Sequence, residues 1–132
     1  ALTWKAWRHR VQKMPEEPDW KETKEYVETV KFRAEQLQEP EAQRELGAVH
    51  YEGHTEGDVE QSRESATVHW EAAARKGDIW SAWYTALVTI QDGRPQDAHE
   101  FLDMVAQASA GALSFMAMHF KFRFGLGVPA NP

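Results

Sequence analysis

The sequence predicts an all-α protein built from helix pairs that recur along the chain. Between positions 20 and 37, apolar residues follow one another at intervals of three and four, the period of one helix face. From residue 41 onward, small residues return at matching places in successive segments. With 132 residues, the chain is long enough for one domain with a substantial core.

The composition limits the classes of function. There are 21 Asp and Glu residues against 15 Lys and Arg, and this excess of acid disfavours binding to nucleic acid. The absence of cysteine excludes disulfides, thiolate catalysis and cysteine-based zinc sites. The most apolar stretch, residues 106–120, is shorter than the roughly 20 residues that a membrane-spanning helix needs, so we expect no membrane span.

Residues 1–40 are expected to form N-terminal helices that cap the rest of the fold. The basic stretch 2–14 predicts a first helix that ends at "PEEP"; its tryptophans and basic residues would also suit nucleic acid, but capping is the preferred interpretation. A second helix begins after Asp19, a good N-cap residue, and ends at "EPE" (39–41). Its core-facing stripe is predicted to consist of Trp20, Thr23, Val27, Val30, Ala34 and Leu37.

The repeats begin with two alanines, Ala42 and Ala82, each followed eleven residues later by a glycine, Gly53 and Gly93. A second alignment sets Ala66 beside Ala98. The residues at equal offsets are His69, Trp70, Ala73, Ala74 and Gly77 after Ala66, and Phe101, Leu102, Val105, Ala106 and Ser109 after Ala98.

A third, partial copy places Gly125 at the position of Gly93. These alignments divide the chain into copies at 41–77, 78–109 and 110–128, with a tail at 129–132. Within the second copy, residues 82–93 and 98–109 are expected to form two adjacent helices that run in opposite directions. The segment "FKFRF" (120–124) also alternates like an edge strand, but the register of the repeat favours a helix.

The first copy resembles the Sel1-like repeat family, which is related to tetratricopeptide repeats. The matching residues are Ala42, Leu46, Gly47, Gly53, Ala66, Ala73, Ala74 and Gly77, together with "FGLGVP" at 124–129. Tyr51 and Trp70 each lie one place later than the family pattern, and the second copy has Ala86-Leu87 where the pattern has Leu-Gly. The resemblance implies an α/α superhelix, or solenoid, of helix hairpins.

Gly47 lies inside a predicted helix, where glycine costs roughly 1 kcal/mol relative to alanine. We interpret it as a point of close approach between two helices, because a residue without a side chain lets a neighbouring helix come near. Ala73 and Ala74 are expected to supply the opposing flat surface.

No motif predicts an enzyme. His50 and His54 have the spacing at which two imidazoles on one helix can share zinc, with Asp58 and His69 nearby in sequence. However, Gly53 stands between them where the helix should end, no third ligand is fixed, and His50 occupies an aromatic position of the repeat. Nucleophile-elbow, phosphate-loop and dinucleotide motifs are absent from the sequence. We therefore predict no catalytic residues, metal or cofactor, with a metal-dependent enzyme as the least favoured alternative.

By the resemblance, a partner protein binds the concave face formed by the first helices of successive repeats. The predicted binding residues are Arg44, Tyr51, Glu52, Tyr84, Gln91, Met116, Phe120 and Arg123. Further positions on the same face are Glu41, Ala48, Ser81, Val88, Asp92, Leu113 and Phe124.

The predicted function is therefore non-catalytic protein–protein interaction. An alternative implied by the resemblance is a bacterial immunity protein that neutralises a secreted toxin. The resemblance and the absence of an initiator Met favour the bacterial periplasm or envelope over the cytoplasm. The apolar C-terminal segment carries more apolar surface than one neighbouring helix can bury. This predicts either that the chain is part of a longer repeat array, or that this end contacts another copy of the chain or another protein.

Overall fold

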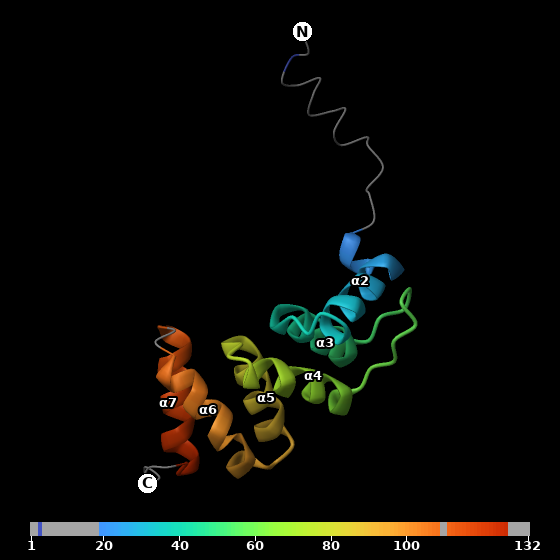
Figure 1. The fold of residues 1–132 in the computed structure, drawn as a ribbon. Helices are drawn as coiled ribbons and strands as arrows, with labels where there is room; N and C mark the ends of the chain where they lie inside the picture. Colours follow the sequence, from blue (N-terminus) through green and yellow to red (C-terminus); the bar gives the residue numbers. More distant parts are fainter. Residues whose placement is uncertain (1–2, 4–18, 109–110, 127–132) are drawn as a thin grey trace.

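The computed structural model describes residues 3, 19–108 and 111–126, and in this part the chain is helical, with one isolated bridge between His54 and Val59. The all-α prediction is confirmed. Figure 1 shows the helices following one another from α2 at one end to α7 at the other. The elements are η1 (Trp20–Glu22), α2 (Lys24–Glu35), α3 (Pro40–Glu52), α4 (Arg63–Arg75), α5 (Ile79–Gln91), η2 (Pro95–Ala98), α6 (His99–Gln107) and α7 (Ala112–Phe124).

Local capping explains where most of these helices begin. The side chains of Thr23, Ser62 and Asp78 accept hydrogen bonds from backbone N–H groups in the first turns of α2, α4 and α5. Helix α3 begins instead with Pro40, whose missing N–H group would have no helical partner in any case. Gly125 ends α7 in the left-handed conformation, with φ of 67°.

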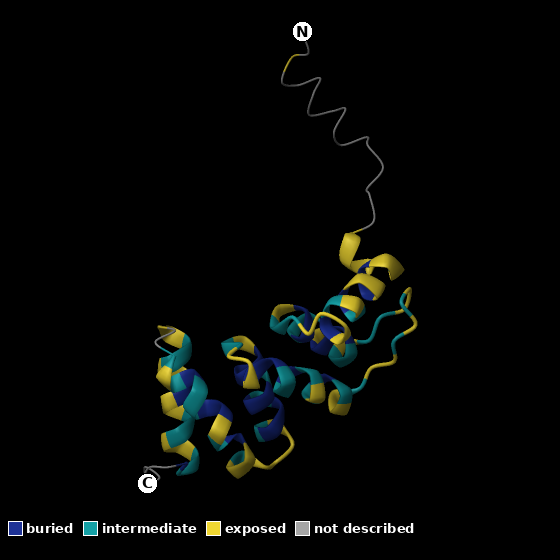
Figure 2. Cartoon of the chain, viewed as in Figure 1, coloured by how far each residue is buried: buried dark blue, intermediate teal, exposed yellow. Residues whose placement is uncertain are grey.

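Each helix packs against the next helix in the sequence, from α2 on α3 to α6 on α7. The buried residues lie between neighbouring helices, as Figure 2 shows in dark blue. One cluster joins α2 to α3, a small one joins α4 to α5, and the largest joins the elements from α4 to the end of α7. Alanines with no exposed surface recur in these contacts, which lets the helices approach closely.

The two helices predicted for the second copy are present. Helices α5 and α6 overlap the predicted ranges 82–93 and 98–109 and pack against each other. The C-terminal segment is also helical, so the prediction of a helix rather than an edge strand at 120–124 is confirmed. The helix predicted at 2–14 lies, apart from Thr3, outside the described residues.

The second predicted helix differs from the expectation at both ends. Val27, Val30 and Ala34 are buried as predicted, but Trp20 and Leu37 are more than half exposed. Thr23 adopts an extended backbone and caps α2, so Trp20 belongs to a separate 3-10 turn. Leu37 lies two residues beyond Glu35, the last residue of α2. The core-facing stripe is therefore shorter than the sequence spacing suggested.

Gly47 does mark a close approach between helices, but its partner is not the one expected. A Cβ atom at this position would lie 2.3 Å from Nε1 and 2.4 Å from Cδ1 of Trp70 on α4. The indole N–H group of Trp70 donates to the carbonyl oxygen of Arg44, 3.0 Å away on α3. The atoms nearest to a Cβ at position 47 belong to the indole ring of Trp70, and not to Ala73 or Ala74, which were expected to supply the opposing flat surface.

Replacing Gly47 with Ala is therefore expected to destabilise the protein, although alanine is the better helix former by about 1 kcal/mol. The added methyl group must displace a buried ring, which typically costs about 1–3 kcal/mol. Urea denaturation followed by circular dichroism would measure the change in the free energy of unfolding.

The matched control repeats the substitution in a Trp70→Ala background. There, Gly47→Ala should be neutral or stabilising, because no indole ring opposes the methyl group. Equal effects of Gly47→Ala in the two backgrounds would contradict the proposed contact.

Candidate functional site

A chain of aromatic rings marks the place where α3, α4 and α5 meet. The ring centroids of Tyr51 and Trp70 are 5.5 Å apart, and those of Trp70 and Tyr84 are 5.3 Å apart. Trp80 extends the chain, with its ring centroid 6.2 Å from that of Tyr84. Centroid distances of 4.5–7 Å are typical of favourable aromatic pairs. One ring from each of α3 and α4 and two from α5 are thus held together.

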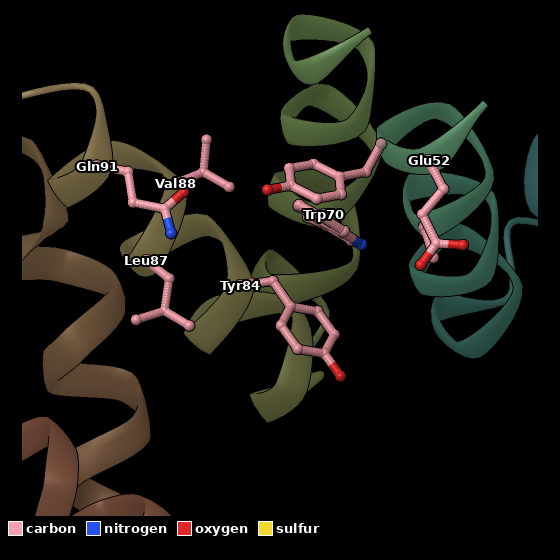
Figure 3. A pocket seen from close by; sticks show the side chains of 8 residues that line it. Glu52, Trp70, Tyr84, Leu87, Val88 and Gln91 are labelled. Carbon is pink, nitrogen blue, oxygen red and sulfur yellow. The ribbon is translucent and has the colours of Figure 1, made fainter. Parts of the chain in front are cut away.

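An open groove lies over these rings, with a volume of about 350 Å³. This volume is at the lower end of the range typical of ligand sites. In Figure 3, Trp70 lies between Glu52, from α3, and the α5 residues Leu87, Val88 and Gln91. The lining residues are Ala48, Tyr51, Glu52, Trp70, Tyr84, Leu87, Val88 and Gln91.

Trp70 forms the buried base of this groove. Its side chain is only 5% exposed, and its N–H group is occupied by the carbonyl oxygen of Arg44. Tyr51 and Tyr84, on either side of it in the chain of rings, are partly exposed. Trp70 therefore supports the groove, while the two tyrosines offer aromatic surface to a ligand.

Glu52 is the one formally charged residue among those that line the groove. It is exposed and makes no ion pair with any residue in the part of the chain that the structure describes. At the α5 side, Gln91 accepts a hydrogen bond from Arg63 at 3.3 Å, and the charge of Arg63 is compensated by Asp92 at 2.9 Å. The groove thus has an uncompensated negative charge.

The structure brings together half of the binding residues predicted from the sequence. Tyr51, Glu52, Tyr84 and Gln91 line the groove, as do two further predicted positions, Ala48 and Val88. Those six residues come from the first helices of two successive predicted copies. That they bind a partner remains a prediction.

The other predicted binding residues do not line this groove. Arg44 pairs with Asp78 at 3.3 Å, and the remaining three, Met116, Phe120 and Arg123, lie on α7. Phe120 packs toward Trp83, with the ring centroids 5.7 Å apart. The related prediction that Ser81 faces the concave side is wrong, because Ser81 has no exposed surface.

The sequence interpretation missed Leu87 and Trp70 as groove residues. Leu87 follows Tyr84 by three positions and precedes Gln91 by four, so helical spacing on its own could have placed it on this face. The resemblance places Trp70 one position late in the family pattern and gives it no part in the concave face. The signal that it reaches α3 was the glycine at position 47, which leaves room for a ring.

The histidines considered for zinc are engaged in other contacts. Nδ1 of His54 accepts a hydrogen bond from the N–H group of Gly57 at 2.8 Å, so the ring proton lies on Nε2, which donates to the carbonyl oxygen of Lys21 at 2.8 Å. These bonds attach the loop after α3 to the start of the helical stack. Within residues 19–108 and 111–126, no three His, Asp or Glu side chains are grouped so that they could hold a metal ion.

His50 and His69 stack on each other across the contact between α3 and α4. Their ring centroids are 5.0 Å apart and the ring planes differ by 22°. Burial lowers the pKa of both imidazoles; Lys31 lowers that of His50 further, and His50 lowers that of His69, while Glu35 opposes both shifts. The neutral form of the pair is therefore the form that stabilises the fold.

Helix α7 exposes an apolar face at the end of the stack, where Figure 2 shows a run of exposed residues. Phe115 is 78% exposed, and Met118 and Phe122, which follow it at helical spacing, are each more than 40% exposed. Met116, at 48%, adds to this surface.

None of the helices in the described ranges is long and apolar enough to cross a membrane.

No family model matches this chain, and no curated protein and no solved structure matches it.

The His50–His69 pair predicts that stability decreases as the pH falls. Because both pKa values are lowered in the folded state, the unfolded chain binds more protons than the folded chain once the pH falls below about 6.5, the ordinary histidine value. The free energy of unfolding should therefore decrease between pH 7.5 and about 5.5, a window above the ordinary pKa values of carboxyl groups.

Urea denaturation across this range would measure the dependence, with a His69→Gln variant as the comparison. The variant should show a smaller loss of stability at low pH, because one titrating ring and the repulsion between two imidazolium groups are both removed. The same pH dependence in both proteins would exclude the pair as its cause.

Because α7 exposes this apolar face, self-association of the chain through α7 remains a prediction. Sedimentation velocity should then show a concentration-dependent dimer that is weakened by Phe115→Ser. Phe32→Ser, which replaces a comparably apolar and exposed residue on α2, is the control and should leave the dimer intact. A wild-type chain that remains monomeric at its highest soluble concentration would refute self-association.

Proposed function

We propose that this chain is a non-catalytic protein-binding module of the Sel1-like repeat type, in which successive helix hairpins form a superhelix and a partner protein binds its concave face. The sequential packing of α2 to α7 supports this proposal, because repeat proteins are built from units that contact only their neighbours. The repeated alanines at the start of each unit, Ala42, Ala66, Ala82 and Ala98, have no exposed surface.

The observation that carries the proposal is the groove between α3 and α5. It gathers six side chains that the resemblance to Sel1-like repeats assigns to one face, and these come from helices separated in sequence by the whole of α4. Tyrosine and tryptophan are enriched among the residues that contribute most to binding energy at protein interfaces. The base of the groove is also fixed in position, since the Trp70 ring is buried and its N–H group is hydrogen-bonded.

The chemistry of the lining favours binding over catalysis. Among the described residues that line it, the titratable groups are the carboxylate of Glu52 and the phenols of Tyr51 and Tyr84, with no histidine, serine or lysine. A nucleophile with an adjacent base, the arrangement typical of covalent catalysis, has no counterpart in this set of residues. Shape and aromatic surface are what the groove offers to a ligand.

The proposal is tested by filling the groove without disturbing the core. Ala48 is exposed, lines the groove and lies within α3, so Ala48→Tyr adds a bulky side chain at a position that can accept it. Recovery of the bound partner from a lysate of the source organism, measured by quantitative mass spectrometry, should fall about tenfold or more.

Val68→Tyr is the matched control, because Val68 is 65% exposed on α4 and does not line the groove. Both variants should retain the helical content and unfolding midpoint of the wild type. Equal recovery of the partner by Ala48→Tyr and Val68→Tyr would refute the groove as the binding site.

A further inference from the structure

We propose that the groove between α3, α4 and α5 binds an extended basic segment of its partner protein through an arginine side chain, whose guanidinium group contacts Tyr51 and Tyr84 and pairs with Glu52. This inference rests on the proposed function and adds the chemistry of the ligand. It is carried by two properties of the groove: its charge and its aromatic surface.

The negative charge of Glu52 favours a positively charged ligand in the groove. Glu52 is its one formally charged lining residue and makes no ion pair in the described ranges, whereas nearby Arg63 is already paired with Asp92 at 2.9 Å. An acidic or phosphorylated segment would meet this carboxylate as a like charge. A wholly apolar segment would bury it without a partner, which is unfavourable.

The aromatic surface of the groove favours a planar cation. Tyr51 and Tyr84 are partly exposed on the two sides of the buried Trp70, with ring centroids 5.5 Å and 5.3 Å from that of Trp70. Cations are attracted to the faces of such rings, and the planar guanidinium group can stack on a ring while its edge donates two hydrogen bonds to a carboxylate. Arginine therefore matches both features of the lining.

The ends of three helices lie near the groove. Glu52 is the last residue of α3 and Gln91 is the last residue of α5, while Arg63, the first residue of α4, donates to Gln91. The partial negative charge of two C-terminal turns is opposed by that of an N-terminal turn, so the helix dipoles do not decide the charge of the ligand. A groove of about 350 Å³ that opens to the surface can accept one long side chain and part of the segment that carries it.

The test uses two peptides that differ in charge but hardly in shape. Acetyl-Ala-Arg-Ala-amide and its citrulline analogue, in which the guanidinium group is replaced by a neutral urea, are titrated into the full ¹⁵N-labelled chain. The indole N–H signal of Trp70, assigned with a Trp70→Phe variant, and the backbone amides of Tyr51, Glu52 and Gln91 report binding.

The arginine peptide should shift these signals saturably, and the citrulline peptide should bind about five- to tenfold more weakly. Glu52→Gln should weaken binding of the arginine peptide by a similar factor and remove most of the difference between the two peptides. Glu60→Gln, which neutralises an exposed carboxylate outside the groove, should leave the affinity unchanged. Equal affinity for both peptides, or an unchanged affinity in Glu52→Gln, would overturn the proposal.

The outcomes separate this inference from the proposed function. If Ala48→Tyr prevents capture of the partner but both peptides bind equally, the groove is a binding site and the assignment of arginine is wrong. If Ala48→Tyr leaves capture of the partner unchanged, the proposed function fails irrespective of the peptide result.

Discussion

The contact between the Trp70 indole ring and the backbone of α3 at Gly47 determines how closely α3 and α4 pack. A Cβ atom at position 47 would overlap the ring, so the observed approach requires glycine there. The hydrogen bond from the indole to the carbonyl oxygen of Arg44 fixes the ring in that place. From this position the ring meets Tyr51 on α3 and Tyr84 on α5. The groove therefore depends on a packing contact that is itself largely buried.

The parts of the fold that follow from local chemistry could be predicted from the sequence. Pro40 starts a helix because it lacks an N–H group, which would have no helical partner in the first turn. Val27 and Val30 are buried because their spacing places them on one side of α2. Such signals act within a few residues, so a single sequence is enough to interpret them.

The expectations that the structure corrects depend on contacts between distant residues or on a choice between competing local signals. Thr23 has helical spacing but also caps α2, and its hydrogen bond to the N–H group of Tyr26 separates Trp20 from that helix. Gly47 indicated a close approach without indicating the partner, since an alanine surface and an indole ring both need the space. The same limit applies to the groove, where the resemblance predicted six residues of α3 and α5 but neither Leu87 nor the Trp70 base between the helices.

Buried and exposed aromatic residues have different roles in this arrangement. Trp70 loses its conformational freedom when the protein folds, and so it adds no ordering cost when a ligand binds. Tyr51 and Tyr84 are partly exposed, but each lies against the fixed indole ring, which limits the rotamers available to them. Binding to side chains that are already ordered costs less entropy than binding to free ones. Under the proposed function, the glycine at position 47 contributes to recognition indirectly, because it admits the ring against which the lining of the groove is ordered.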